Sequence, residues 1–239
     1  MEKLEKLKQW VSESKRIVFF GGAGVSTESG IADFRSVDGL YNQKFEYPPE
    51  TIISHSFYLQ DPSYFFRFYR DKMLPLGFEP NITHIKLAQW ETEGKLGGII
   101  TQNIDGLHQM AGSQNVLELH GSIHRNYCMN CGATYTLAET LAHGTIPHCE
   151  CGGLIRPEVV LYEEPLDDTV ITKAIHAISS ADLLIVGGTS LTVYPAAGFL
   201  DFYQGSKLVV INLDSTGYDN KAALTINGKI GEVLGQLTI

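Results

Sequence analysis

Long apolar runs, an excess of positive charge and dispersed cysteines are all missing from this sequence. No stretch approaches the roughly 18 apolar residues of a membrane-spanning helix. The opening segment, MEKLEKLKQW, mixes acidic and basic side chains, so we expect no secretory signal and a cytoplasmic protein. Because 18 Lys and Arg stand against 27 Asp and Glu, for a net charge of -9, we expect binding to neither membranes nor nucleic acid.

The four cysteines form two close pairs in one short segment. Cys128 and Cys131 make a C-x-x-C pair, and Cys149 and Cys151 make a C-x-C pair. Four thiolates are the closed tetrahedral set that binds structural zinc, so the spacing predicts one Zn²⁺ per chain, held by all four. A redox C-x-x-C is an alternative that the second pair disfavours, and His148 is an alternative ligand.

Apolar runs of strand length alternate with helical patterns along most of the chain. Runs at residues 17–20, 98–100, 183–186 and 208–211 end in small or polar residues. Further strands are predicted at 117–119 and 159–162, and helices at 3–14, 83–93 and 169–179. The alternation predicts an α/β fold with a doubly wound, Rossmann-like parallel sheet, whose ligands lie outside the carboxyl ends of the strands.

The first apolar run ends at a turn lined by Gly21, Gly22 and Gly24. Glycines let backbone N–H groups approach a pyrophosphate, and the N-terminus of a following helix would add a favourable dipole. The third glycine of a full dinucleotide-binding motif is missing, so a plain structural turn is an equal alternative. Ser26 is open to a second interpretation as well, because a serine after a turn is often a helix cap.

The segment at residues 22–35 reads GAGVSTESGIADFR and resembles the sirtuin signature at every fixed position but one. Three further blocks agree in order and spacing, namely TQNID at 101–105, ELHG at 118–121, and GTSL at 188–191 with Pro195-Ala196. The resemblance covers nearly the whole chain, and the compact length is similar to that of the small bacterial members. The mismatch is Ala32, where the family usually has proline, so we expect a looser loop there.

The resemblance implies an NAD⁺-dependent protein-lysine deacetylase that acts as a monomer on acyl-lysine peptides bound in extended form. NAD⁺ would be a co-substrate: the acyl carbonyl oxygen attacks C1′ as nicotinamide leaves, and the products are free lysine and O-acyl-ADP-ribose. One alternative is an NAD⁺-dependent protein ADP-ribosyltransferase, although relatives specialised for that reaction tend to lose the histidine that stands here as His120. Another alternative is a non-catalytic NAD⁺-binding zinc scaffold.

Within the matched blocks, His120 is the natural base near neutral pH. The resemblance makes it catalytic together with Asn103 and Asp105. The cofactor-binding residues that the resemblance implies are Gly22, Ala23, Gly24, Ser26, Thr27, Asp33, Phe34, Arg35, Gln102, Asn103, Ile104, Asp105, His120, Gly188, Thr189, Ser190, Asn212 and Leu213. We assign structural roles to His55, His84, His143 and His176, and leave a direct role open for His108 and His124.

The same resemblance implies three structural parts. Residues 1–38, 81–125 and 158–239 would form a Rossmann-like NAD-binding domain. Residues 39–80, rich in aromatics and broken by prolines, would form a helical insertion with the cofactor loop. Residues 126–157 would form a small zinc-binding module.

Two departures from the family pattern concern the substrate. Glu163 replaces the glycine of the usual F-G-E, in a segment that pairs with the peptide in the family, so its acid is expected to favour basic flanking residues. Members that remove succinyl groups carry a Tyr-x-x-Arg pair, whose places here align with Phe66 and Tyr69. An uncharged acyl group such as acetyl is therefore expected. A slip of two residues would instead align Tyr64 and Arg67 and reverse this inference.

Overall fold

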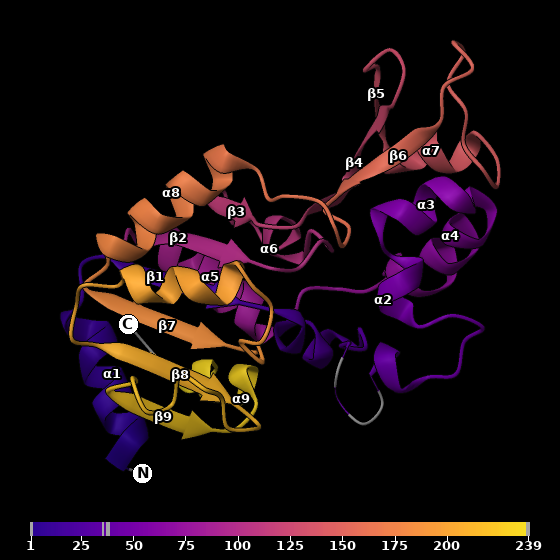
Figure 1. Cartoon of the computed structure of the whole chain (residues 1–239). Coiled ribbons are helices and arrows are strands. Elements are labelled where there is room, and N and C mark those ends of the chain that lie inside the picture. Colours follow the sequence, from indigo (N-terminus) through magenta and orange to yellow (C-terminus); the bar gives the residue numbers. More distant parts are fainter. Residues whose placement is uncertain (1, 35, 37–38, 238–239) are drawn as a thin grey trace.

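The computed structural model describes residues 2–34, 36 and 39–237, so the predicted cofactor residue Arg35 lies outside the described residues. Within them, six parallel strands form the main sheet in the order β3-β2-β1-β7-β8-β9 (Figure 1). The strands are β1 (Ile17–Gly21), β2 (Leu96–Thr101), β3 (Val116–Glu118), β7 (Leu183–Gly187), β8 (Leu208–Asn212) and β9 (Leu224–Asn227). The strand order reverses between β1 and β7, which confirms the predicted doubly wound sheet.

Helices cover both faces of this sheet, which is why β1, β7 and β8 are buried at every position. They are α1 (Glu2–Glu13), α5 (Ile82–Thr92), α6 (Leu107–Met110), α8 (Asp168–Ser179), α9 (Ile230–Leu234) and the 3-10 helix η5 (Ala196–Phe202). Ile17 and Phe19 pack with α1, α5 and α9 on one face, whereas Val18 and Phe20 pack with α8 and η5 on the other. No helix of the described ranges is long and apolar enough to cross a membrane.

A second, antiparallel sheet has the order β5-β4-β6 and lies beyond the carboxyl ends of the main strands, beside helices α2 to α4 (Figure 1). Its elements and neighbours are β4 (Gly121–Cys128), β5 (Thr134–Thr136), α7 (Leu137–Ala142), β6 (Ile155–Val159), the 3-10 helix η3 (Leu40–Asn42), α2 (Pro49–Ile52), α3 (His55–Gln60), α4 (Pro62–Phe68) and the π-helical turn η4 (Tyr69–Met73). A third apolar cluster, in which Phe65 packs with Ile123 and Leu161, joins the helices to this sheet.

Two sequence predictions were wrong. The strand expected at 159–162 is not formed, because β6 ends at Val159 and the chain then crosses to the helices, where the Tyr162 N–H donates to the Ile53 carbonyl (3.0 Å). The helix expected after the glycine turn is replaced by two 3-10 turns, η1 (Ala23–Val25) and η2 (Thr27–Ser29). The second turn ends at Gly30, whose φ of 95° is left-handed.

The core contains two neutral histidines, His84 and His108. Their ring centroids lie 4.7 Å apart, and the two side chains are 0% and 1% exposed. The His84 Nδ1 accepts the Asn81 N–H (3.2 Å) and thereby caps α5. Burial lowers the pKa of His84 to about 4 and that of His108 to about 3, so both rings are neutral at pH 7.

This pair makes stability depend on acidity. Unfolding exposes both rings, which then bind protons near the ordinary pKa of 6.5. The unfolded chain therefore holds more protons, and the free energy of unfolding falls as the pH falls from 6.5 toward 4, by up to about 1.4 kcal/mol per pH unit for each histidine. In urea unfolding between pH 7 and 5, His108→Phe should have a slope shallower than wild type by about 1 kcal/mol per pH unit. The matched control is His176→Phe on the exposed face of α8, and equal slopes for all three chains would contradict the assignment.

Candidate active site and metal centre

The loops after β1 and β7 touch through their backbones at the point where the strand order reverses. The Gly24 N–H donates to the Gly188 carbonyl (2.8 Å). A Cβ on Gly188, whose φ is 61°, would lie 2.4 Å from the Val25 nitrogen, and a Cβ on Gly24 would lie 2.9 Å from the Gly188 Cα. Both positions thus require glycine, and the turn's glycines serve a close approach of two strand ends.

Ser26, Asn103 and Asp105 meet in one hydrogen-bonded group beside this contact. The Ser26 hydroxyl donates to Asp105 Oδ2 (2.7 Å) and accepts from Asn103 Nδ2 (3.0 Å). The other carboxylate oxygen of Asp105 accepts the Leu107 N–H (2.9 Å). Ser26 is 1% exposed and makes no helix-capping bond, so its interpretation as a cap was wrong. The group joins the end of β1 to the end of β2.

Thr189 and Asn212 connect the ends of β7 and β8 in the same way. The Thr189 N–H donates to Asn212 Oδ1 (3.1 Å), and Asn212 Nδ2 donates to the Thr189 carbonyl (2.9 Å). Gln102 Nε2 donates to the Thr189 hydroxyl (3.1 Å) and so reaches this pair from β2. Ser190 and Leu213 are exposed next to it. Polar groups from four neighbouring strands therefore gather at one edge of the sheet.

His120 follows β3 and is held by the backbone of β2. Its Nδ1 lies 2.9 Å from the carbonyl oxygen of Gln102. A carbonyl oxygen only accepts, so Nδ1 carries the proton, and in the neutral ring Nε2 keeps its lone pair. Burial lowers the pKa of His120 below its ordinary 6.5, against the opposing effect of the Gln102 bond. At neutral pH the ring is therefore a base that is ready to accept a proton at Nε2.

Three further predicted cofactor residues, Thr27, Asp33 and Phe34, lie in η2 and on the segment that follows it. Asp33 Oδ1 accepts the Ser36 N–H (2.9 Å), and Phe34 packs edge-on against Tyr41, with ring centroids 5.5 Å apart. The Thr27 hydroxyl donates to the Gly24 carbonyl (2.9 Å) and closes the glycine turn. Both Phe34 and Ile104 are half-buried against the third apolar cluster, so this cluster reaches the site.

The two positions that align with the Tyr-x-x-Arg pair of succinyl-removing members lie inside the third apolar cluster. Phe66 and Tyr69 are 1% and 2% exposed. Arg67 is exposed, and its guanidinium lies 4.4 Å from the centre of the Tyr64 ring. Arg70 donates to the Gly144 carbonyl and ties η4 to the cysteine segment. The Arg67 guanidinium thus has its partner away from Phe66 and Tyr69, whereas the Arg70 charge lies close enough to Tyr69 to oppose the rise that burial causes in the pKa of its hydroxyl.

Glu163 occupies a backbone conformation that favours glycine, with φ at 76°. Its carboxylate accepts the Ser56 N–H and hydroxyl, both at 2.9 Å, which holds the residue against the start of α3. Sequence reasoning missed the neighbouring contact, in which the Tyr162 hydroxyl lies 2.7 Å from the Tyr41 hydroxyl. That bond spans 121 positions, and only the folded chain brings the two rings together.

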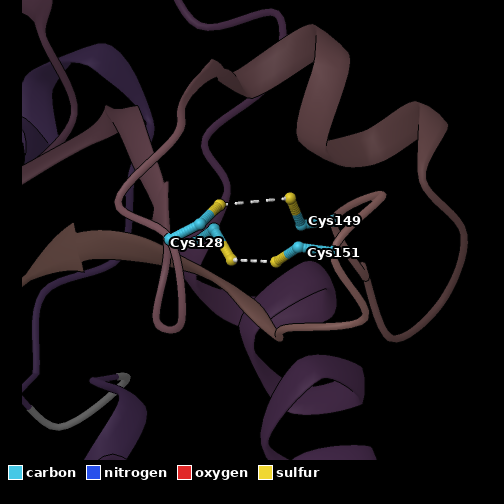
Figure 2. Close-up of side chains that lie close together, drawn as sticks. Cys128, Cys149 and Cys151 are labelled. Carbon is cyan, nitrogen blue, oxygen red and sulfur yellow. Dashed lines mark hydrogen bonds between the residues drawn. The ribbon is translucent and has the colours of Figure 1, made fainter.

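The four cysteine sulfurs converge between β4 and the loop before β6 (Figure 2). All lie within 4.8 Å of one another, with Cys128 to Cys151 at 3.5 Å and Cys131 to Cys149 at 3.6 Å. A tetrahedral zinc with Zn–S bonds of about 2.3 Å needs sulfur separations of about 3.8 Å, so the set fits Zn²⁺. His148 lies outside the group, because its exposed ring bonds the Ile146 carbonyl instead (3.0 Å).

Comparisons with known proteins agree on one family. The family model described as "Sir2 family" matches residues 22–195. An NAD-dependent protein deacetylase from Clostridium acetobutylicum is 57% identical over 98% of this chain and 97% of its own length. A solved structure of Sir2 with a p53 peptide and NAD⁺ has a TM-score of 0.88 and 38% identity, covering 98% of this chain and 96% of its own. A Sir2 structure bound to an acetylated peptide has a TM-score of 0.87 and 36% identity, with the same coverage.

Zinc removal should destabilise the chain, because binding to a structural site contributes directly to folding. Elemental analysis should give one zinc per chain for wild type and for the control His148→Ser. Cys128→Ser, or extraction with a chelator, should lower the midpoint of thermal unfolding by roughly 10 °C for a loss on the order of 3 kcal/mol. A metal-free chain that unfolds at the wild-type temperature would rule out a structural role.

Proposed function

The chain belongs to the Sir2 family, and we propose that it is an NAD⁺-dependent protein-lysine deacetylase that transfers the acyl group to ADP-ribose and releases nicotinamide. One observation carries the proposal: the neutral ring of His120, held on the Gln102 carbonyl, and the hydrogen-bonded group of Ser26, Asn103 and Asp105 both lie at the carboxyl ends of neighbouring strands. Relatives named as deacetylases over nearly the full chain support it.

We propose that NAD⁺ binds along the edge where the four strands end. The glycine turn lies at this edge and would receive the pyrophosphate, and Asn103 and Asp105 would supply polar contacts for nicotinamide and ribose. Phe34 shields the reacting face from water. The other cofactor-binding residues predicted from the sequence remain part of this proposal, Arg35 included.

His120 would then act as general base on the co-substrate. Once the acyl oxygen has displaced nicotinamide at C1′, the former acyl carbon belongs to an imidate that links the lysine to the ribose. A ribose hydroxyl must then lose its proton to attack this carbon. The neutral ring accepts that proton at Nε2, while Nδ1–H stays fixed on the Gln102 carbonyl and stabilises the resulting cation. The lowered pKa keeps the ring neutral before each turnover.

The division into an NAD-binding domain, a helical insertion and a zinc module is part of this proposal. The sheet β5-β4-β6 would carry the zinc module, and the metal would stabilise the module without taking part in catalysis, since four thiolates leave no position for water. We propose an acyl-lysine peptide bound in extended form near Tyr162, and a monomeric, cytoplasmic enzyme that binds neither nucleic acid nor membranes.

Mass spectrometry of an acetyl-lysine peptide, incubated with and without NAD⁺, separates this function from its alternatives. NAD⁺-dependent loss of acetyl supports the deacetylase. Gain of ADP-ribose by a protein or peptide would instead identify a transferase. An unchanged peptide, under conditions where the chain binds NAD⁺, would identify a non-catalytic scaffold.

Removing the His120 ring or the Asn103 side-chain amide should abolish turnover without unfolding the chain. His120→Ala and Asn103→Ala should each lower kcat by about 10²–10⁴, the usual effect of losing a positioned catalytic group. The control His176→Ala, on the exposed face of α8, should keep the wild-type rate. Near-wild-type turnover in a folded His120→Ala chain would refute the base assignment.

The enzyme should strongly prefer an uncharged acyl group over a charged one. If Phe66 and Tyr69 line the acyl end, a succinyl carboxylate enters apolar surroundings without the Arg67 guanidinium, at a cost of several kcal/mol. The kcat/KM for acetyl-lysine should therefore exceed that for succinyl-lysine by about 10²–10³. Arg67→Ala should leave this ratio unchanged. Equal efficiencies in wild type would contradict the alignment and show that Arg67 or Arg70 reaches the pocket, and loss of succinyl activity in Arg67→Ala would identify Arg67.

A further inference from the structure

Tyr135 contacts the cysteine cluster with its hydroxyl. This residue lies on β5, and its hydroxyl donates to Cys149 Sγ at 3.0 Å. Its ring packs against the small apolar cluster of Cys128, Cys149 and Ile155. The contact is therefore fixed twice, by ring packing and by the pairing of Tyr135 with Asn126 on β4.

A hydrogen bond to a zinc-bound thiolate has a defined physical effect. Four thiolates on one Zn²⁺ leave a net charge of about -2, which donors to sulfur must stabilise. The C-x-x-C side supplies such a donor from the backbone, the Asn130 N–H to Cys128 Sγ (3.4 Å). At Cys149 the hydroxyl of Tyr135 approaches more closely, and a hydrogen bond to an ionised acceptor is roughly twice as strong as a neutral one.

The C-x-C spacing explains why a side-chain donor is needed to orient the Cys149 sulfur. With one residue between Cys149 and Cys151, the backbone has less freedom to place both sulfurs on one metal ion than in a C-x-x-C pair. A donor from another strand fixes the Cys149 side chain in its metal-facing orientation. We propose that Tyr135 is a positioning residue of the zinc site, and that its hydroxyl sets how tightly the module retains zinc.

This role can be measured on the metal itself, away from catalysis. Tyr135→Phe keeps the packed ring and removes only the hydroxyl. In competition with a zinc chelator, it should bind zinc about tenfold more weakly than wild type, at the lower end of effects for partners of metal ligands. In the cobalt-substituted chain the sulfur-to-metal charge-transfer band should move to lower energy, because a thiolate without its hydrogen bond is a stronger electron donor.

Tyr127→Phe is the matched control. Tyr127 lies on β4 of the same sheet, with its ring beside Arg156, 5.8 Å from the guanidinium, and it should keep wild-type zinc affinity and cobalt spectrum. The proposal is overturned if Tyr135→Phe binds zinc within about twofold of wild type with an unchanged cobalt band.

A second variant covers the case in which Tyr135→Phe does not fold. Placing 3-fluorotyrosine at position 135 preserves the shape of the side chain and makes its hydroxyl a more acidic, stronger donor. Zinc release to excess chelator should then be slower than in wild type. Release at the wild-type rate or faster would equally overturn the proposal.

Discussion

The contact between the Gly24 N–H and the Gly188 carbonyl is the constraint on which the site depends. It lies at the ends of the parallel strands β1 and β7, where the strand order reverses, and the two loops meet there without any side chain between them. Ser26 follows one partner and Thr189 follows the other, so this contact sets the distance between the serine group and the Thr189–Asn212 pair. A methyl group at either glycine would separate the two halves of the site.

Burial then determines the chemistry of the polar groups that this contact brings together. Burial lowers the pKa of His120 and so favours the neutral ring, and its tautomer is set by a backbone carbonyl rather than by another charge. Each carboxyl oxygen of Asp105 accepts a hydrogen bond within the chain, from the Ser26 hydroxyl and from the Leu107 N–H. The chain connects the cysteine cluster directly to this region, since β4 begins at Gly121, directly after His120, and ends at Cys128.

Much of the fold followed from the sequence, because strands buried on both faces leave continuous apolar runs. The predicted helices begin and end within one residue of the observed ones, and the candidate site residues at strand ends do lie together. Predictions from local sequence patterns were wrong where tertiary contacts determine the structure. The run at 159–162 is apolar because it crosses between two buried clusters, and the partners of Tyr162 and Tyr135 lie far away in the sequence or on another loop. No local signal points to β9, which is short and only partly buried.

The stoichiometry of one reaction tests the central claim most directly. Purified chain, a stated amount of acetyl-lysine peptide and excess NAD⁺ are allowed to react, and deacetylated peptide, nicotinamide and O-acetyl-ADP-ribose are quantified together. An acyl transfer in which His120 activates the ribose hydroxyl predicts equal amounts of all three at every time point. Release of free acetate from the first turnovers, with nicotinamide formed in smaller amount than deacetylated peptide, would contradict it.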